Sequence, residues 1–178
     1  AVFDEVKRLA KEKGALPGIL TFYPHPMQVL APDIHVPLLQ SASEKLEALS
    51  SAGMALAVCI TPSIGFLSAS ADDFLEELSR LPGLAGVVTG ENFSFGHGGL
   101  GKSADMKRFF AGSRVTVRIV SLRENAGKKI SSTAIRQAIL GGEMEKAARL
   151  LGRDYTIKGD VVHGFRRGHD VLGFPTAN

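Results

Sequence analysis

Residues 86–101 read Gly86-Val-Val-Thr-Gly-Glu-Asn-Phe-Ser-Phe-Gly-His-Gly-Gly-Leu-Gly101, a short apolar run followed directly by a glycine-rich one. The apolar run predicts a buried strand, and residues 90–101 hold five glycines in twelve positions. Glycine lets the backbone approach a ligand closely, and the Asn92 side chain can bond a phosphate or a ribose. Phe93 and Phe95 are two positions apart, and we expect one to face the core and the other a pocket. The alternative for this segment is a flexible surface loop.

Strands and helices alternate on both sides of this stretch. Four apolar runs predict strands, at 18–22, 55–60, 86–89 and 115–120. Helices are predicted at 2–12, 41–51, 70–80, 104–110, 132–140 and 143–151. Two of them are opened by capping boxes, Ser41-x-x-Glu44 and Ser70-x-x-Asp73. Strands that alternate with helices at this spacing predict an α/β fold, a parallel sheet with helices on both faces.

The composition is that of a soluble globular protein, with 44% hydrophobic and 22% charged residues. No apolar run approaches the roughly 18 residues that a membrane span needs. The lone Cys59 lies in the continuously apolar run 55–60, which predicts a strand buried on both faces and a buried thiol. Because one cysteine cannot form an internal disulfide, we expect a cytoplasmic protein.

The alternation of strands and helices stops near Arg153. Residues 155–163 predict a solitary strand with no helix after it, and 164–173 read as a loop of glycines and arginines. We therefore predict one domain at 1–152 and the beginning of another at 153–178.

Positive charge is concentrated in one segment of the chain. Residues 1–100 carry a net charge of −5 and residues 101–136 carry +7, within a total of +3. Such a segment suits a polyanion, either a nucleic acid or the phosphates of a nucleotide. A solvated basic face is the alternative, and charge alone does not decide between them.

Three polar clusters directly follow predicted strands, at 23–26, 90–101 and 128–133. In an open parallel sheet, ligands bind at the carboxyl ends of the strands. The common placement of the three clusters therefore predicts that they line one site.

The segment Lys129-Ile-Ser-Ser-Thr-Ala-Ile-Arg136 is the strongest indication of a ligand. Ser131 or Ser132 can cap the helix that follows, which leaves backbone N–H groups free at its N-terminus. Those donors, the helix dipole and the flanking Lys129 and Arg136 form a cradle suited to phosphates. The alternative is an ordinary N-cap with a basic helix face.

Two proline-containing segments carry weaker indications. In Thr21-Phe-Tyr-Pro-His-Pro26, prolines at a strand end predict a rigid wall for a flat ring, and His25 either binds phosphate or bonds the loop. In Gly173-Phe-Pro-Thr-Ala-Asn178, the Thr176 hydroxyl and the Asn178 carbonyl are placed to coordinate Mg²⁺ together with phosphate oxygens. An unremarkable turn is the alternative for the second segment.

Five segments together resemble the prokaryotic bifunctional riboflavin kinase/FMN adenylyltransferase, or FAD synthetase, in the family's order and over essentially the whole chain. They are Pro-His-Pro at 24–26, Gly-Glu-Asn-Phe-Ser-Phe-Gly at 90–96, Ile-Ser-Ser-Thr-x-Ile-Arg at 130–136, Leu-Leu-Gly-Arg-Asp-Tyr at 150–155 and Gly-Phe-Pro-Thr-Ala-Asn at 173–178. Each alone is moderately specific, and five in order are highly specific.

The resemblance implies a Rossmann-like nucleotidyltransferase domain at 1–152 that moves AMP from ATP to FMN, giving FAD and pyrophosphate. It implies the start of a β-barrel riboflavin kinase domain at 153–178, which phosphorylates riboflavin to FMN in the intact protein. ATP, FMN and riboflavin would be its ligands, with Mg²⁺ accompanying ATP. No nucleic acid and no membrane is implied, and a homo-oligomer is left open.

The same resemblance assigns residues to the two sites. By position, the catalytic residues are Asn92, Ser132, Thr133 and Arg136. The residues near nucleotide or flavin are Pro24, His25, Pro26, Phe95, Lys129 and Ser131. The Mg²⁺-ATP residues of the kinase domain are Thr176 and Asn178.

The chain departs from the family at both ends. The family begins with a strand and a Gly-x-Phe-Asp-Gly-Val-His-x-Gly-His segment whose histidines assist the reaction at the α-phosphate, and Ala1 stands where that segment would just have ended. The kinase domain stops at Asn178, before most of its barrel. We therefore expect an internal fragment of a longer protein, whose activity belongs to the intact form.

Three rival functions remain at this point. The first is a nucleotidyltransferase with another acceptor, such as phosphopantetheine, which the Pro-Thr-Ala-Asn tail disfavours. The second is a nucleic-acid-binding module that uses the basic segment 101–136. The third is a non-catalytic nucleotide- or flavin-binding remnant.

Overall fold

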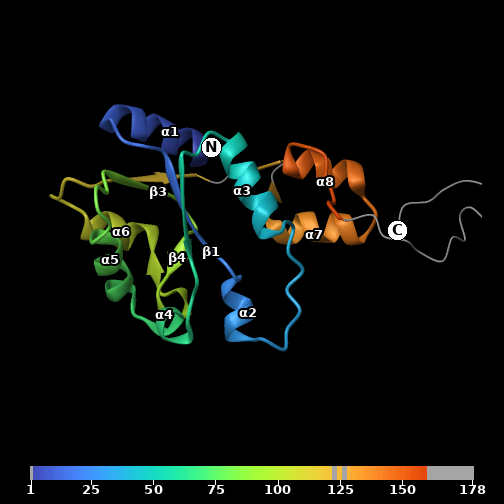
Figure 1. Ribbon diagram of the computed structural model, residues 1–178, viewed down its shortest axis with the longest axis horizontal. Helices are drawn as coiled ribbons and strands as arrows, with labels where there is room; N and C mark the ends of the chain where they lie inside the picture. The colour runs from blue at the N-terminus through green and yellow to red at the C-terminus, as the bar shows by residue number, and fades with distance from the viewer. Residues whose placement is uncertain (1, 122–123, 126–127, 160–178) are drawn as a thin grey trace, which may run out of the picture. The chain divides into compact units, whose positions relative to one another are not determined.

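The structure is a computed structural model that describes residues 2–121, 124–125 and 128–159, and of 124–125 and 128–129 the backbone alone (Figure 1). It divides into two units, 1–132 and 133–178. The helices of the first unit are α1 (Val2–Lys13), α2 (Pro26–Leu30), α3 (Ala42–Ser51), α4 (Ile64–Ser68), α5 (Ala71–Ser79) and α6 (Ser103–Phe109), with a 3-10 turn η1 (His97–Gly99). Its strands are β1 (Gly18–Phe22), β2 (Leu56–Ile60), β3 (Gly86–Gly90), β4 (Ser94–Phe95), β5 (Gly101–Lys102), β6 (Thr116–Val120), β7 (Glu124–Asn125) and β8 (Lys128–Lys129). Helix α7 (Ser132–Leu140) begins at the junction of the units, and α8 (Met144–Leu151) follows it.

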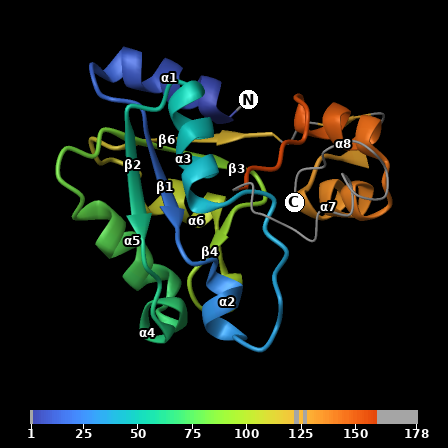
Figure 2. The same cartoon turned by 45° about the vertical axis from the view of Figure 1, so that its right-hand side comes forward.

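The longer strands form two parallel ladders. Strand β1 pairs with β2, with Gly18 opposite Leu56, and β3 pairs with β6, with Gly86 opposite Thr116. Figure 2 shows β1 and β2 side by side and pointing the same way. The predicted parallel α/β class is confirmed, although the four longer strands form two two-stranded ladders rather than one sheet.

The two predicted capping boxes are present and explain where α3 and α5 begin. The Ser41 N–H donates to the Glu44 carboxylate at 2.7 Å, and the Glu44 N–H donates to the Ser41 hydroxyl at 3.3 Å. The Ser70 N–H likewise donates to Asp73 at 3.0 Å, with a return bond of 3.1 Å. In each pair, the two bonds satisfy two backbone N–H groups that would otherwise have no partner at the start of the helix.

The core of the first unit lies where α5, α6 and β4 meet (Figure 1). Its buried side chains are Leu75, Leu78, Phe95, Met106 and Phe110. Helix α1 packs on β3, and it does so closely because Gly86 has no side chain: a Cβ there would lie 2.6 Å from the Leu9 side chain. The strand that leads into the 90–101 loop is therefore anchored by a helix as well as by β6.

The prediction that the second apolar run is buried on both faces is wrong. In β2, Leu56 is 54% exposed and the Cys59 residue is exposed as well. Among the described strands β2 pairs with β1 alone, so it is an edge strand of its ladder. A continuous apolar run does not by itself distinguish an edge strand from a central one.

The second unit confirms the predicted helix pair, split by Gly141 and Gly142. Helix α8 ends at Gly152, which has a φ of 72°, a left-handed conformation that favours glycine. The described residues 155–159 form no strand, whereas a strand was predicted over 155–163. The rest of that prediction and most of the predicted start of a barrel lie outside the described residues. In the part that the structure describes, no helix is long and apolar enough to span a bilayer.

Candidate functional site

The chain turns sharply after β1 at the predicted proline wall. The Tyr23 N–H donates to the Ile60 carbonyl at 3.0 Å, which extends the β1–β2 pairing by one residue. The peptide bond between Tyr23 and Pro24 is cis, and Pro26 opens α2 at the helix position where a missing N–H costs nothing. Pro24 and Pro26 are half-buried, as two sides of a fixed turn would be.

His25 is the N-cap of α2. Its Nδ1 accepts the Met27 N–H at 3.2 Å, and its own N–H donates to the Gln28 side chain at 3.0 Å. Of the two roles left open by the sequence, the structure supports the loop hydrogen bond. A phosphate contact for His25 stays a prediction, and it would have to use the ring's other nitrogen.

The 90–101 loop is a built hairpin rather than a flexible segment. Strands β4 and β5 pair antiparallel, with Phe95 opposite Gly101, and the His97 N–H donates to the Ala69 carbonyl at 2.7 Å. At Gly101 a Cβ would lie 2.6 Å from the Phe95 ring, so the hairpin closes only with glycine there. The bond from His97 to Ala69 joins the loop to the segment just before α5.

Phe95 lies in the core, which confirms the expectation of one core-facing ring, and the half-buried Phe93 packs against the same core, so a ring that faces a pocket stays a prediction. The side chain of Phe95 is 6% exposed, stacks on Phe93 at a centroid distance of 5.8 Å, and packs against Phe74 at 5.0 Å. Core packing explains Phe95 without a ligand. Its predicted flavin contact therefore stays a prediction, and Phe93 is the more accessible ring of the two.

A row of aromatic side chains joins the end of β1 to β4. Phe22, at the end of β1, contacts Phe66 at a centroid distance of 5.9 Å, and Phe66 contacts Phe74 at 6.5 Å. Phe74 reaches Phe95 in turn. Sequence reasoning missed Phe66 and Phe74, because nothing in their spacing links them to these two strands. The row connects the proline turn to the 90–101 loop inside one unit.

Asn92 lies in the turn just after β3 and is exposed. The turn is fixed on both sides, because the Glu91 N–H donates to the Val120 carbonyl at 3.0 Å and the Phe93 N–H donates to the Gly90 carbonyl at 3.1 Å. A carboxamide in this place can both donate and accept hydrogen bonds, as a phosphate or ribose contact requires.

The residues of the predicted phosphate cradle lie on both sides of the division of the chain after residue 132. Ser131 is exposed just before α7, and Ser132 and Thr133 are the exposed first residues of that helix. Arg136 is half-buried on α7. Lys129 lies in β8, and its side chain is outside the described residues, as are Thr176 and Asn178. The cradle residues Thr133 and Arg136 belong to the second unit, and the other described site residues belong to the first.

Part of the basic segment 101–136 is neutralised within the chain. Arg118 donates to Glu5 at 2.8 Å and pairs with Glu12, and Arg108 pairs with Asp105. Hydrogen bonds to Glu12 and Glu5 raise the pKa of Arg118. Hydrogen bonds from Arg8 and then Arg118 lower the pKa of Glu5, against the opposing effect of desolvation. Arg118 thus joins β6 to α1, and Arg108 pairs with a carboxylate of its own helix, α6. Because their charges are paired, the two arginines contribute less to a basic surface.

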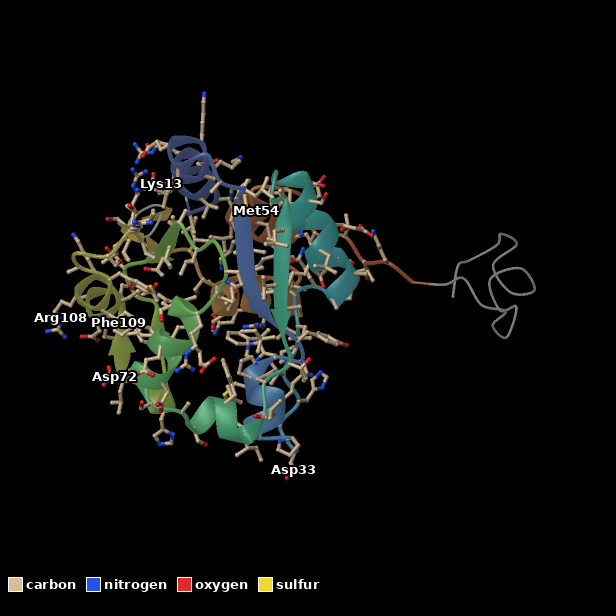
Figure 3. All side chains as sticks on the ribbon, turned by 60° about the vertical axis from the view of Figure 1, so that its left-hand side comes forward. Lys13, Asp33, Met54, Asp72, Arg108 and Phe109 are labelled. Atoms are coloured by element: carbon tan, nitrogen blue, oxygen red, sulfur yellow. The ribbon has the colours of Figure 1, made fainter. Side chains whose placement is uncertain are left out.

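A shallow pocket on the outer side of α5 and α6 contains none of the predicted site residues. It is lined by Asp72, Leu75, Leu100, Asp105, Arg108 and Phe109, together with Ala71 and Gly101. Figure 3 shows Asp72, Arg108 and Phe109 on the same side of the unit. We give this pocket no role in the chemistry, because the strand ends carry the polar clusters. Among the described residues, no group of three or more histidine, cysteine, aspartate or glutamate side chains could hold a metal ion.

Two family models match the chain. Residues 1–134 match the FAD synthetase family and residues 151–178 match the riboflavin kinase family. The first match holds the proline turn, the 90–101 loop, Lys129 and the three hydroxyl residues of the cradle. The second holds Thr176 and Asn178.

Curated relatives named bifunctional riboflavin kinase/FMN adenylyltransferase are similar over nearly the whole chain. The relative from Listeria monocytogenes is 38% identical over 180 residues, which cover 100% of this chain and 56% of the relative. The one from Bacillus subtilis is 34% identical, covering 99% of this chain and 56% of the relative. The chain thus spans about half the length of the curated relatives it matches.

A solved structure has the same fold. It is a crystal structure described as that of a macrolide-efflux protein from Streptococcus pneumoniae, with a TM-score of 0.87 and 31% sequence identity. The match covers 99% of this chain and 57% of that one.

Proposed function

The chain belongs to the FAD synthetase family, and on that premise we propose that the protein it represents transfers AMP from ATP to FMN, giving FAD and pyrophosphate. The observation that carries the proposal is the turn after β3. A parallel strand and a braced hairpin fix its two ends, and it presents Asn92 to solvent where an open parallel sheet binds its ligands.

The reaction is an in-line displacement. An FMN phosphate oxygen attacks the α-phosphorus of ATP; the new P–O bond forms as the bond to the pyrophosphate oxygen breaks. Such chemistry requires positioning and charge stabilisation rather than a protein nucleophile. Asn92 orients the nucleotide next to the end of β3.

The cradle at the start of α7 receives the leaving group. Ser131, Ser132 and Thr133 offer hydroxyls and backbone N–H groups at a helix N-terminus, where the helix dipole favours negative charge. Arg136, one turn into the helix, and Lys129 supply positive charge for the pyrophosphate. Preorganised donors of this kind lower the barrier because they need no rearrangement as charge develops.

The flavin lies against the proline turn in this proposal. Pro24 and Pro26 form its wall, with His25 between them, and Phe95 supports the wall from the core through Phe74 and Phe66. Mg²⁺, bound together with ATP, would supply positive charge to the phosphates. Thr176 and Asn178 are the proposed ligands of the Mg²⁺-ATP of the kinase domain, and no adenylyl-transfer step here depends on them.

The second proposed activity is phosphorylation of riboflavin to FMN. It is supported by the match of residues 151–178 to the riboflavin kinase family, and we propose with it that the domain boundary lies after residue 152. ATP, FMN and riboflavin are then the partners of the whole protein, which we place in the cytoplasm. A homo-oligomer remains open.

Two rival functions have less support. A nucleotidyltransferase with another acceptor would have no use for a riboflavin kinase segment. A nucleic-acid-binding module would need the basic segment 101–136 exposed, whereas Arg108 and Arg118 are paired within the chain. A non-catalytic remnant is distinguished from an enzyme only by turnover.

The test is turnover of FMN and ATP by the intact protein with Arg136→Ala, and with Arg149→Ala as the matched control. Arg149 is an exposed arginine on α8 that lies 3.8 Å from Glu145. Loss of a preorganised charged contact should lower kcat by about 100- to 1000-fold, or about 3–4 kcal/mol in the barrier, for Arg136→Ala. The control should retain its turnover. Unchanged turnover in Arg136→Ala would remove this residue from the proposed site.

A further inference from the structure

The Ser103 hydroxyl links the two ends of the 90–101 loop. Ser103 is the first residue of α6, just after the loop, and is 2% exposed. Its hydroxyl donates to the Gly90 carbonyl at 2.7 Å and accepts the Thr89 hydroxyl at 3.1 Å. The Phe93 carbonyl lies 3.5 Å from the same oxygen. One buried oxygen therefore meets three groups at the point where β3 becomes the loop.

The hydroxyl is not needed as a helix cap. Helix α6 begins at a different N-cap, Lys102, whose N–H donates to the Asp105 carboxylate at 2.8 Å. Helix starts usually employ serine to satisfy their own N–H groups, whereas Ser103 turns its hydroxyl away from the helix and toward the end of a strand. Its partner Thr89 is 7% exposed, so both hydroxyls are withdrawn from water and depend on one another.

The rest of the loop is held without Ser103. Phe95 is in the core, the β4–β5 pairing closes the hairpin, and the His97 N–H is bonded to Ala69. The stretch between Gly90 and Phe93 has no buried side chain of its own. Two backbone bonds and the stacking of Phe93 on Phe95 also hold this stretch, and the Ser103 hydroxyl adds a side-chain bond at the Gly90 carbonyl, where the stretch begins.

We propose that Ser103 is a positioning residue for the adenylyl-transfer site. By bonding the Gly90 carbonyl, it fixes the turn that presents Asn92 before any ligand arrives. The inference rests on the proposed function, because it assumes that Asn92 meets the nucleotide. Ser103 itself touches no substrate.

A positioning role has a kinetic signature. If this clamp, the hydrogen bond from the Ser103 hydroxyl to the Gly90 carbonyl, is lost, the turn that holds Asn92 occupies several conformations. Only a fraction of the molecules is then competent to bind the nucleotide. The apparent affinity then falls by that fraction, whereas the bound complex reacts at its usual rate. Removing the Ser103 hydroxyl leaves the Gly90 carbonyl with the Phe93 N–H and takes from the buried Thr89 hydroxyl the oxygen to which it donates. Loss of the acceptor of a buried donor predicts about a tenfold change. The KM for ATP or FMN should therefore rise about tenfold in Ser103→Ala, with kcat within about twofold of the parent.

Two control variants separate positioning from general damage. Thr89→Val removes the other hydroxyl but keeps the Ser103–Gly90 bond, so it should raise KM by less than Ser103→Ala. Leu78→Ala removes a buried side chain of the same core and should lower global stability without changing KM. If Ser103→Ala instead lowers the active fraction and leaves KM unchanged, as Leu78→Ala does, the positioning role is refuted.

Amide hydrogen exchange of the intact protein gives a readout that does not depend on activity. In Ser103→Ala, exchange should rise about tenfold at residues 91–93 and stay unchanged in β1 and β2. An equal rise in the exchange rate at all amides of the first unit would refute the local role of the Ser103 hydrogen bond. Absence of FAD formation by the parent protein would refute the proposed function instead, and the exchange result would still decide the role of Ser103 in the loop.

Discussion

Gly96 is the position where one added methyl group should do the most damage to the 90–101 loop. Its φ of 72° and ψ of 177° lie in a region that only glycine occupies readily. A Cβ there would stand 2.6 Å from the Ala71 nitrogen and 2.7 Å from the Ala71 Cα, at the start of α5. These are backbone atoms of a capped helix, so the neighbour cannot rotate away.

The magnitude follows from the two effects. The disfavoured backbone conformation costs about 1–3 kcal/mol, and the overpacking against Ala71 adds about 1–3 kcal/mol. Gly96→Ala should therefore lower the free energy of unfolding by about 2–6 kcal/mol. Gly112→Ala is the matched control, because Gly112 also has a positive φ, 77°, but has nothing within 4 Å of a built Cβ. It should cost only about 1–2 kcal/mol.

The assay is urea unfolding followed by far-UV circular dichroism, with parent and variants measured under the same conditions. The difference between the two variants isolates the contact with Ala71, since both pay for a positive φ. Equal destabilisation by Gly96→Ala and Gly112→Ala would show that the loop does not press on the start of α5, and the description of a braced hairpin would be wrong.

Three further predictions concern the fold. Leu75→Ala, at a side chain 2% exposed, should cost about 2–5 kcal/mol in urea unfolding, whereas Leu140→Ala, 81% exposed, should change stability by less than about 0.5 kcal/mol; similar values for both would contradict the assigned core. Ser41→Ala should cost about 1 kcal/mol through loss of the α3 cap, and an unchanged melting temperature would count against that cap. Hydrogen bonds from the Ser70 hydroxyl and N–H lower the pKa of Asp73, so its ionised form stabilises the fold above its unfolded pKa and this contribution disappears as pH falls through the folded pKa. The difference in urea midpoint between parent and Asp73→Asn should therefore shrink below about pH 4, and a constant difference from about pH 3 to pH 6 would contradict it.

The sequence predicts those parts of the fold that depend on local signals. Capping boxes at Ser41 and Ser70 mark helix starts because their partners are three residues away. Apolar runs locate the four longer strands to within a residue at most ends. The signal for α2 was also present, since Pro26 suits the first position of a helix and His25 can cap it.

The features that the sequence did not predict depend on contacts between distant residues. The exposure of Cys59 follows from the place of β2 at the edge of its ladder, which no local pattern reveals. The row from Phe22 through Phe66 and Phe74 to Phe95 needs the packing of α4 and α5. The Ser103–Thr89 pair joins residues fourteen positions apart.

The candidate site also has features that the sequence predicts and features that only the structure reveals. The sequence predicts which residues follow the strands. The structure adds that the loop holding Asn92 is closed by the β4–β5 pairing and that His25 caps α2. The two-residue spacing of Phe93 and Phe95 is that of side chains on the same face of an extended segment, and in the structure Phe93 packs, half-buried, against the core that contains Phe95.

The central claim is tested most directly by supplying the intact protein with FMN, ATP and Mg²⁺ and measuring FAD and pyrophosphate by chromatography. The account predicts equal amounts of the two products, and no adenylylated product when phosphopantetheine replaces FMN. Adding riboflavin in place of FMN should give FMN first and FAD afterwards. ATP binding without FAD formation from FMN, or adenylylation of another acceptor in its place, would contradict the claim.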